Sequence, residues 1–127
     1  MKLIDKTPVD ILLHRGERTN KPGCEFASDP GDFGRGIYWT TTKVRAFQYG
    51  EVRTEKVRFE SPAVMSLEDA YRLCDQFNCI GHGVSQEQRL LNCEALTKFM
   101  LAKGYDSLIA IDSRSDSLEI VDYRPYR

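Results

Sequence analysis

An apolar run near the start of the chain predicts a β-strand. Residues 11–13 read Ile-Leu-Leu and continue through His14 and Arg15 to Gly16, a pattern typical of a short strand that ends at a glycine. Residues 17–33 follow with a high density of Gly, Pro, Asn, Asp and Ser. They predict a long loop, and a loop of this length in a small domain is often functional.

The pattern near the C-terminus predicts two more strands. Residues 105–111 and 118–123 are mainly apolar, and the polar segment 112–116 separates them. Two such runs joined by a short polar segment indicate a β-hairpin.

The segment between the loop and residue 60 predicts a strand, a helix and a second strand. Residues 34–40 are β-prone and are entered through two glycines. Thr42 is placed to cap the helix. Residues 51–60 alternate crudely between apolar and polar positions, and Ser61 and Pro62 are expected to end that strand. The aliphatic and aromatic positions of the expected helix are Val44, Ala46, Phe47 and Tyr49.

Two further helices are predicted between residues 66 and 104. Ser66 begins the first helix, with acidic residues at 68 and 69, where the helix dipole favours them. The Gly-His-Gly sequence at 81–83 separates it from the second helix, which Gly104 ends. Helical spacing is shown by Leu67, Ala70, Tyr71, Cys74 and Phe77 in the first helix and by Leu90, Leu91, Ala95, Leu96, Phe99 and Met100 in the second.

Strands at both ends with helices between them indicate an α+β fold, and 127 residues suit a single domain over 1–127. Eighteen basic and nineteen acidic residues nearly cancel, so the charge does not indicate a nucleic-acid partner, although a local basic face remains compatible with one. No stretch approaches the ~20 apolar residues of a membrane span, and the N-terminus lacks an apolar signal region. We therefore expect a cytoplasmic protein without a membrane partner.

Four cysteines invite a metal hypothesis. Cys74, Cys79, His82 and Cys93 are close in sequence, but their spacing matches no common zinc site. We expect these cysteines, together with Cys24, to be reduced packing or surface thiols, and we expect no metal.

Several common catalytic motifs are missing from the sequence. No P-loop, HExxH or GxSxG occurs, and Gly34-x-Gly36 lacks the third glycine of a dinucleotide-binding fingerprint. Three features remain: the strand that ends at Gly16, the glycine-entered strand with its aromatic residues, and Glu119 on the C-terminal hairpin.

These three features, in this order, resemble the ADP-ribosyltransferase superfamily, especially its poly(ADP-ribose) polymerase and diphtheria-toxin branch. Residues 33–39, Phe-Gly-Arg-Gly-Ile-Tyr-Trp, are similar to the F-G-x-G-I-Y-F motif of that branch. Ala46 and Tyr49 match its small residue and second tyrosine, and Tyr49 follows Tyr38 by the eleven positions typical of the family. Glu119 matches the catalytic glutamate at the start of the last motif strand. The resemblance extends from Leu12 to Tyr123 and is weakest in the helical middle.

The first motif departs from this pattern. The poly(ADP-ribose) polymerase branch has His-Gly at the strand end, whereas the Arg-Ser-Glu branch has arginine at the equivalent position. Here Arg15 directly precedes Gly16, with His14 one position earlier, so anchoring on the glycine favours Arg15. Because side chains alternate on a strand, His14 and Arg15 are not expected to point into one cleft together.

The resemblance implies a split β-sheet core with flanking helices, and NAD as a substrate. Tyr38 and Tyr49 would sandwich the nicotinamide ring, and the backbone of Gly16 would meet its carboxamide. Glu119 would grip a ribose hydroxyl and stabilise the oxocarbenium ion. Catalytic roles are thus implied for Glu119, Tyr38 and Arg15, and NAD-binding roles for His14, Arg15, Gly16, Gly36, Tyr38, Thr40, Ala46 and Tyr49.

The expected reaction is transfer of one ADP-ribose to a macromolecular acceptor, with protein favoured. Arginine-modifying members carry a glutamate two residues before the catalytic one, and Ser117 stands there, so arginine is disfavoured as the acceptor. By analogy, a small stand-alone domain suggests a toxin or phage effector. Two alternatives remain: transfer to nucleic acid or RNA phosphate through Arg35, Lys43, Arg45 and the basic segment 15–21, and a catalytically inactive binding module with the same fold.

Overall fold

The computed structural model describes residues 7–17, 31–48, 50–80 and 83–127. Six strands, three α-helices and one short 3-10 helix are found in this part of the chain. In chain order they are β1 (Val9–Glu17), β2 (Ile37–Thr40), α1 (Lys43–Phe47), β3 (Glu51–Phe59), β4 (Pro62–Ser66), α2 (Leu67–Gln76), α3 (Gln86–Ala102), β5 (Ser107–Asp112), β6 (Ser117–Asp122) and η1 (Arg124–Tyr126). The expected α+β class is confirmed.

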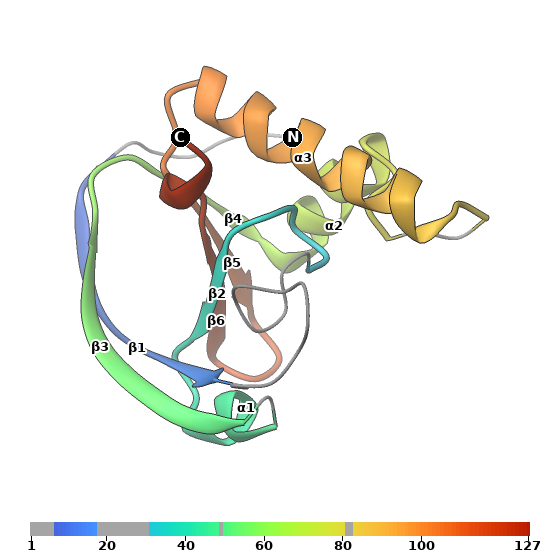
Figure 1. Cartoon of the computed structure of the whole chain (residues 1–127). Helices are drawn as coiled ribbons and strands as arrows, with labels where there is room; N and C mark the ends of the chain where they lie inside the picture. Colours follow the sequence, from blue (N-terminus) through green and yellow to red (C-terminus); the bar gives the residue numbers. More distant parts are fainter. Residues whose placement is uncertain (1–6, 18–30, 49, 81–82) are drawn as a thin grey trace.

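The strands form one mixed sheet in the order β3-β1-β2-β6-β5-β4. All neighbours are antiparallel except β4 and β5, which are parallel and are connected through α2 and α3. Strands β1 and β2 pair only at His14 and Thr40, and the antiparallel β1–β3 pair curves away from the other four strands (Figure 1). The sheet therefore consists of two parts that meet at a single residue pair.

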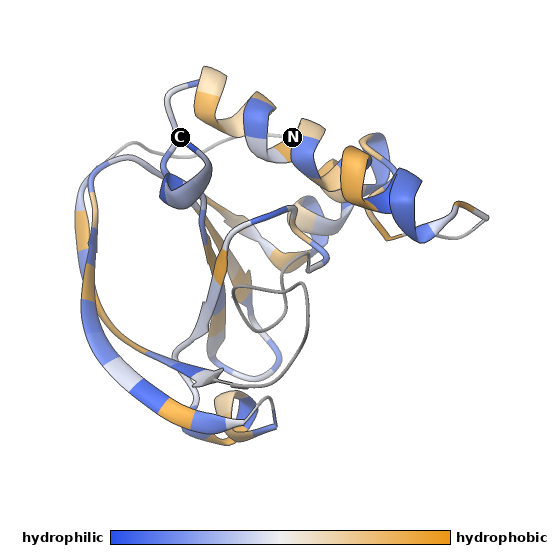
Figure 2. Cartoon of the chain, viewed as in Figure 1, coloured by the Kyte–Doolittle hydropathy of each residue, from blue (hydrophilic) through white to orange (hydrophobic). Residues whose placement is uncertain are grey.

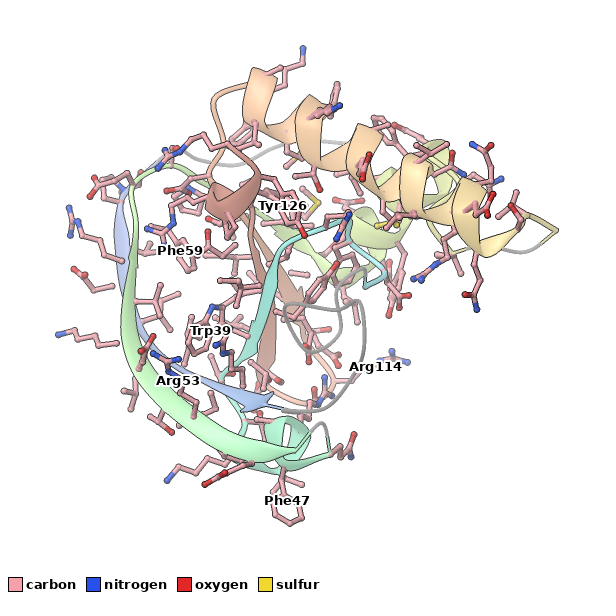
Figure 3. All side chains as sticks on the ribbon, viewed as in Figure 1. Trp39, Phe47, Arg53, Phe59, Arg114 and Tyr126 are labelled. Atoms are coloured by element: carbon pink, nitrogen blue, oxygen red, sulfur yellow. The ribbon has the colours of Figure 1, made fainter. Side chains whose placement is uncertain are left out.

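The two faces of the sheet bury two separate hydrophobic clusters. One face packs against α2 and α3, which both lie on the same side of β2, β6, β5 and β4 (Figure 1). The other face forms a cluster with the inner side of the curved β1–β3 pair, and Trp39 and Phe59 point into this enclosed space (Figure 3). Exposed and buried residues alternate over the last four residues of β3, 56–59, as expected where one face of a strand is buried (Figure 2).

Most of the predicted elements are present. The Ser66 hydroxyl accepts a hydrogen bond from the Asp69 backbone N–H at 3.1 Å, which confirms the predicted cap of α2. Gly104 follows the end of α3 with a φ of +88°, a left-handed conformation that glycine adopts readily. Strands β5 and β6 form the predicted antiparallel hairpin.

The strand predicted over 51–60 ends at Phe59, before Ser61 and Pro62, as expected. Strand β4 was not predicted; it begins at Pro62, where proline is tolerated because β4 is the edge strand of the sheet. One expectation was wrong in detail. Thr42 occupies the N-cap position of α1 without making a side-chain cap bond, because its hydroxyl donates to Ser117 Oγ at 3.1 Å instead. Helix α1 spans five residues.

Candidate functional site

A cavity of about 540 Å³ lies where the two parts of the sheet meet. Its volume is in the range of roughly 300–1,000 Å³ common for small-molecule sites. Strands supply one wall of the cavity, and α1, α2, α3 and the segment before β2 supply the rest. The lining residues are His14, Arg15, Gly16, Gly31, Asp32, Phe33, Tyr38, Trp39, Thr40, Arg45, Ala46, Gln48, Leu67, Tyr71, Arg89 and Glu119.

Three polar side chains form a row across the sheet at this cavity. His14 on β1 is the register partner of Thr40 on β2, and Thr40 is the register partner of Glu119 on β6. Because register partners project to the same face of a sheet, the three side chains lie side by side. On its other side, His14 Nδ1 makes a 2.8 Å hydrogen bond with Thr54 Oγ1. The row thus joins the two parts of the sheet at the point where they meet.

Arg15 faces the opposite side of β1. Its guanidinium carbon lies 5.2 Å from the centroid of the Trp39 ring, which belongs to the cluster enclosed by the curved β1–β3 pair. The two adjacent side chains therefore diverge, as strand alternation requires. His14, and not Arg15, shares a face with Glu119.

Tyr38 lies two positions before Thr40 on β2 and so faces the same side as the row. Its hydroxyl donates to the Gly34 carbonyl at 2.5 Å and accepts from the Phe33 N–H at 3.0 Å. Burial raises the pKa of this hydroxyl well above its usual value. Backbone groups of Phe33 and Gly34, just before β2, thus hold the Tyr38 hydroxyl in place. The half-buried Tyr38 ring lines the cavity.

The two glycines of the Gly34-x-Gly36 motif serve close packing. Gly34 has a φ of +102°, and a Cβ there would lie 2.8 Å from Thr97 Oγ1 on α3. A Cβ on Gly36 would lie 2.4 Å from the Asp122 carbonyl oxygen on β6. Gly36 is not among the residues that line the cavity, in contrast to the expected NAD contact. Its absence of a side chain instead lets β2 approach β6 closely.

Glu119 is held by an arginine that the motif comparison did not select. Arg45 Nη1 on α1 donates a hydrogen bond to Glu119 Oε1, while Arg45 Nη2 contacts Asp112 Oδ2 at 3.3 Å and Ser115 Oγ at 2.9 Å. Burial raises the pKa of Glu119, and Arg45 opposes that rise. Hydrogen bonds from Ser115 and from the Arg114 backbone lower the pKa of Asp112. Arg45 therefore lies between two carboxylates and positions the one in the cavity.

Helix α1 contributes its inner side to the cavity. Ala46 is buried and lines the cavity, as does Gln48 just after the helix. Phe47 points away from the molecule and is 74% exposed (Figure 3). Tyr49, expected as the second wall of the nicotinamide slot, lies outside the described residues.

The wall opposite the strands carries polar and aromatic residues that sequence analysis did not select. Phe33 and Tyr71 pack their rings with centroids 5.4 Å apart. Arg89 Nη2 lies 3.8 Å from Asp32 Oδ1, and its Nε donates to the Cys79 carbonyl at 2.8 Å. The helical periodicity placed Tyr71 in a core stripe, whereas it lies at the edge of that stripe and reaches the cavity.

The cysteines lie away from the cavity lining. Cys74, Cys79 and Cys93 are fully buried in the cluster between the sheet and the helices, and burial raises the pKa of Cys74. Across the described residues, no three His, Cys, Asp or Glu side chains are grouped so as to hold a metal ion. Cys24 and His82 lie outside the described residues.

Comparison with known proteins identifies no relative: no family model, curated protein or solved structure matches the chain. In the part of the chain that the structure describes, no helix is both long and apolar enough to span a membrane.

Proposed function

We propose that the chain is an NAD-dependent mono-ADP-ribosyltransferase that cleaves the nicotinamide–ribose bond of NAD and transfers ADP-ribose to a macromolecular acceptor, most favourably a protein. The observation that carries the proposal is the row of His14, Thr40 and Glu119 at a cavity that Tyr38 and Ala46 also line. Residues separated by up to 105 positions in the chain are thus brought to one small-molecule cavity in the combination that the sequence motifs imply. The two-part sheet supports the implied split-sheet architecture.

The geometry favours His14 for the first motif position. His14 lies on the face of Glu119, whereas Arg15, although it is among the cavity-lining residues, directs its guanidinium toward Trp39. His14 is also fixed in orientation by its hydrogen bond to Thr54. We therefore propose that His14 hydrogen-bonds a ribose hydroxyl of NAD, with Gly16 meeting the carboxamide through its backbone.

Glu119 supplies the charge that the reaction needs. Cleavage breaks the bond between the ribose anomeric carbon and the nicotinamide nitrogen, and the electron pair leaves with nicotinamide. The ribose then develops positive charge, which a nearby carboxylate stabilises. Arg45 binds Oε1 of Glu119, and we assign Oε2 to the ribose hydroxyl. Nicotinamide leaves as a neutral molecule, so no general acid is required, and the acceptor loses its proton as it bonds the anomeric carbon.

Arg45 favours the ionised form of this carboxylate. The partly buried position of Glu119 favours the neutral acid, which could not stabilise an oxocarbenium ion. The guanidinium counteracts this effect, and Asp112 and Ser115 hold the guanidinium in place. We assign Arg45 a positioning role, because it acts on the substrate through Glu119.

Transfer to nucleic acid has less support. Arg35 forms a 3.1 Å ion pair with Glu94 and lies over the Tyr126 ring, and Arg45 is bound to Glu119. Two of the arginines considered for phosphate contacts are therefore engaged within the protein.

The decisive experiment incubates the purified protein with NAD labelled in its adenylate part and with a cell extract. We expect label in the protein fraction and release of nicotinamide, both lost in Glu119→Gln. Label in the nucleic-acid fraction would change the acceptor class. If neither fraction is labelled and no nicotinamide is released, while NAD binding persists, the protein is a binding module and not a transferase.

A further inference from the structure

The second wall of the cavity has no role in the reaction described above. NAD carries two aromatic rings, nicotinamide and adenine, and the strand wall accounts only for the first. We propose that Tyr71, supported by Phe33 and flanked by Asp32 and Arg89, forms the binding site for the adenine ring of NAD. This inference rests on the proposed function, and it names the residues that recognise the other half of the substrate.

Tyr71 presents an accessible aromatic surface inside the cavity. Helix α2 buries Ala70, Leu73 and Cys74 in the core, whereas Tyr71 is 38% exposed and lines the cavity. Phe33, 5% exposed, packs against it at a ring tilt of 48°. Phe33 therefore supports the tyrosine from the protein side, and the free surface of the Tyr71 ring is available for stacking.

The Tyr71 hydroxyl lies in the same electrostatic environment as the catalytic carboxylate. Burial raises the pKa of Tyr71 first, and the negative charges of Asp32, Glu119 and Asp112 raise it further. Tyr71 and Glu119 thus border one continuous cavity from opposite walls. A single extended ligand can contact both.

Asp32 and Arg89 provide the hydrogen-bonding groups that adenine requires. The edge of adenine has an amine that donates and ring nitrogens that accept. The Asp32 carboxylate would accept from the amine, and the Arg89 guanidinium would donate to a ring nitrogen. Arg89 is oriented by its bond to the Cys79 carbonyl, which directs its terminal nitrogens toward Asp32.

This pairing also predicts a base preference. Hypoxanthine has an oxygen where adenine has the amine, so its oxygen would face the Asp32 carboxylate. An acceptor opposed to an acceptor leaves both groups unpaired and disfavours binding. The structure therefore favours adenine over hypoxanthine dinucleotides.

Calorimetric titration with three probes tests the proposal: NAD, nicotinamide mononucleotide, which lacks adenine, and nicotinamide hypoxanthine dinucleotide. We expect Tyr71→Ala to weaken NAD binding by roughly five- to a hundredfold, the range for loss of one base–aromatic stack, and to leave mononucleotide affinity unchanged. Tyr71→Phe keeps the ring and should bind NAD within about twofold of wild type. Phe47→Ala removes an exposed aromatic ring outside the cavity and should change nothing.

Asp32→Asn provides an independent test at an exposed position. We expect it to reduce the preference for NAD over the hypoxanthine dinucleotide.

If Tyr71→Ala leaves the ratio of NAD to mononucleotide affinity unchanged and Asp32→Asn leaves the base preference unchanged, adenine binds elsewhere. This inference then fails, while the proposed function stands. If Tyr71→Ala instead raises only the KM for the macromolecular acceptor, the wall belongs to the acceptor, which also overturns the inference. If the wild type binds none of the three probes, the proposed function fails as well.

Discussion

The two walls of the cavity differ in how they are built. The strand wall takes His14, Thr40 and Glu119 from three neighbouring strands, and the hydrogen-bonded register of the sheet fixes their mutual positions. The helix wall takes Tyr71 from the edge of α2 and Arg89 from α3, and tertiary packing alone brings them together. A rigid sheet suits groups that must meet a reacting bond, whereas helix edges suit groups that recognise a distant part of the substrate.

Loss of the proposed catalytic carboxylate, Glu119, should have the largest effect. We expect Glu119→Gln to reduce nicotinamide release by roughly 10²–10³-fold, because the amide cannot stabilise developing positive charge. NAD affinity should change much less, since the interaction strengthens only in the transition state. Single-turnover rates and calorimetric titration separate the two effects. Turnover near that of the wild type would remove Glu119 from the mechanism, and a matched Glu94→Gln variant controls for loss of a partly exposed carboxylate elsewhere.

Removal of Arg45 should have the next largest effect and should show a distinct pH dependence. Arg45 lowers the pKa of Glu119, so Arg45→Gln raises that pKa and shifts the acidic limb of the rate–pH profile to higher pH. At neutral pH we expect about a tenfold loss of turnover, within the range for a hydrogen bond to a charged group. Arg45→Lys should restore part of both effects.

A rate–pH profile of Arg45→Gln with an unshifted acidic limb would contradict the positioning role. Activity requires the carboxylate form and is therefore lost as the pH falls through the Glu119 pKa, so a higher pKa moves the acidic limb to higher pH. A purely structural role of Arg45 would lower stability without moving the limb.

The smallest effect should distinguish the two adjacent residues on β1. We expect His14→Ala to weaken NAD binding by about fivefold, the value of one hydrogen bond, and Arg15→Ala to act mainly on stability by removing the contact with Trp39. Calorimetry and thermal unfolding of both variants measure the two effects. The opposite result would place Arg15 in the first motif position, as the glycine-anchored comparison of sequences favours.

Sequence patterns predicted the strand wall far better than the helix wall. The family resemblance assigned motif residues on β2 and β6 to one site, and because a strand fixes side-chain direction with a period of two, such motif positions are retained in the folded sheet. The choice between His14 and Arg15 required the register with Thr40, because alternation alone says only that the two diverge. Tyr71 fits helical spacing equally well as a core or a cavity residue, and only the packing of α2 decides between them.

Other differences from the sequence-based expectations have similar physical causes. Strand β4 was missed because a proline at its start suggests a break, although proline is compatible with the start of an edge strand, and edge position is a property of the whole sheet. Thr42 has the right residue type for a helix cap, yet Ser117, distant in sequence, competes for its hydroxyl. The NAD contact expected of Gly36 stays a prediction, and its close contact with β6 gives a separate reason for a glycine there.

The central claim is that one NAD molecule occupies the cavity between the two walls. Two-dimensional NMR of the ¹⁵N-labelled protein, titrated with NAD, tests it most directly. We predict shifts at the amides of Gly16, Thr40 and Glu119 on the strand wall and of Phe33 and Tyr71 on the helix wall, with Glu60 and Lys103 unaffected as residues outside the cavity lining. No shift at millimolar NAD, or shifts confined to another surface, would contradict the claim.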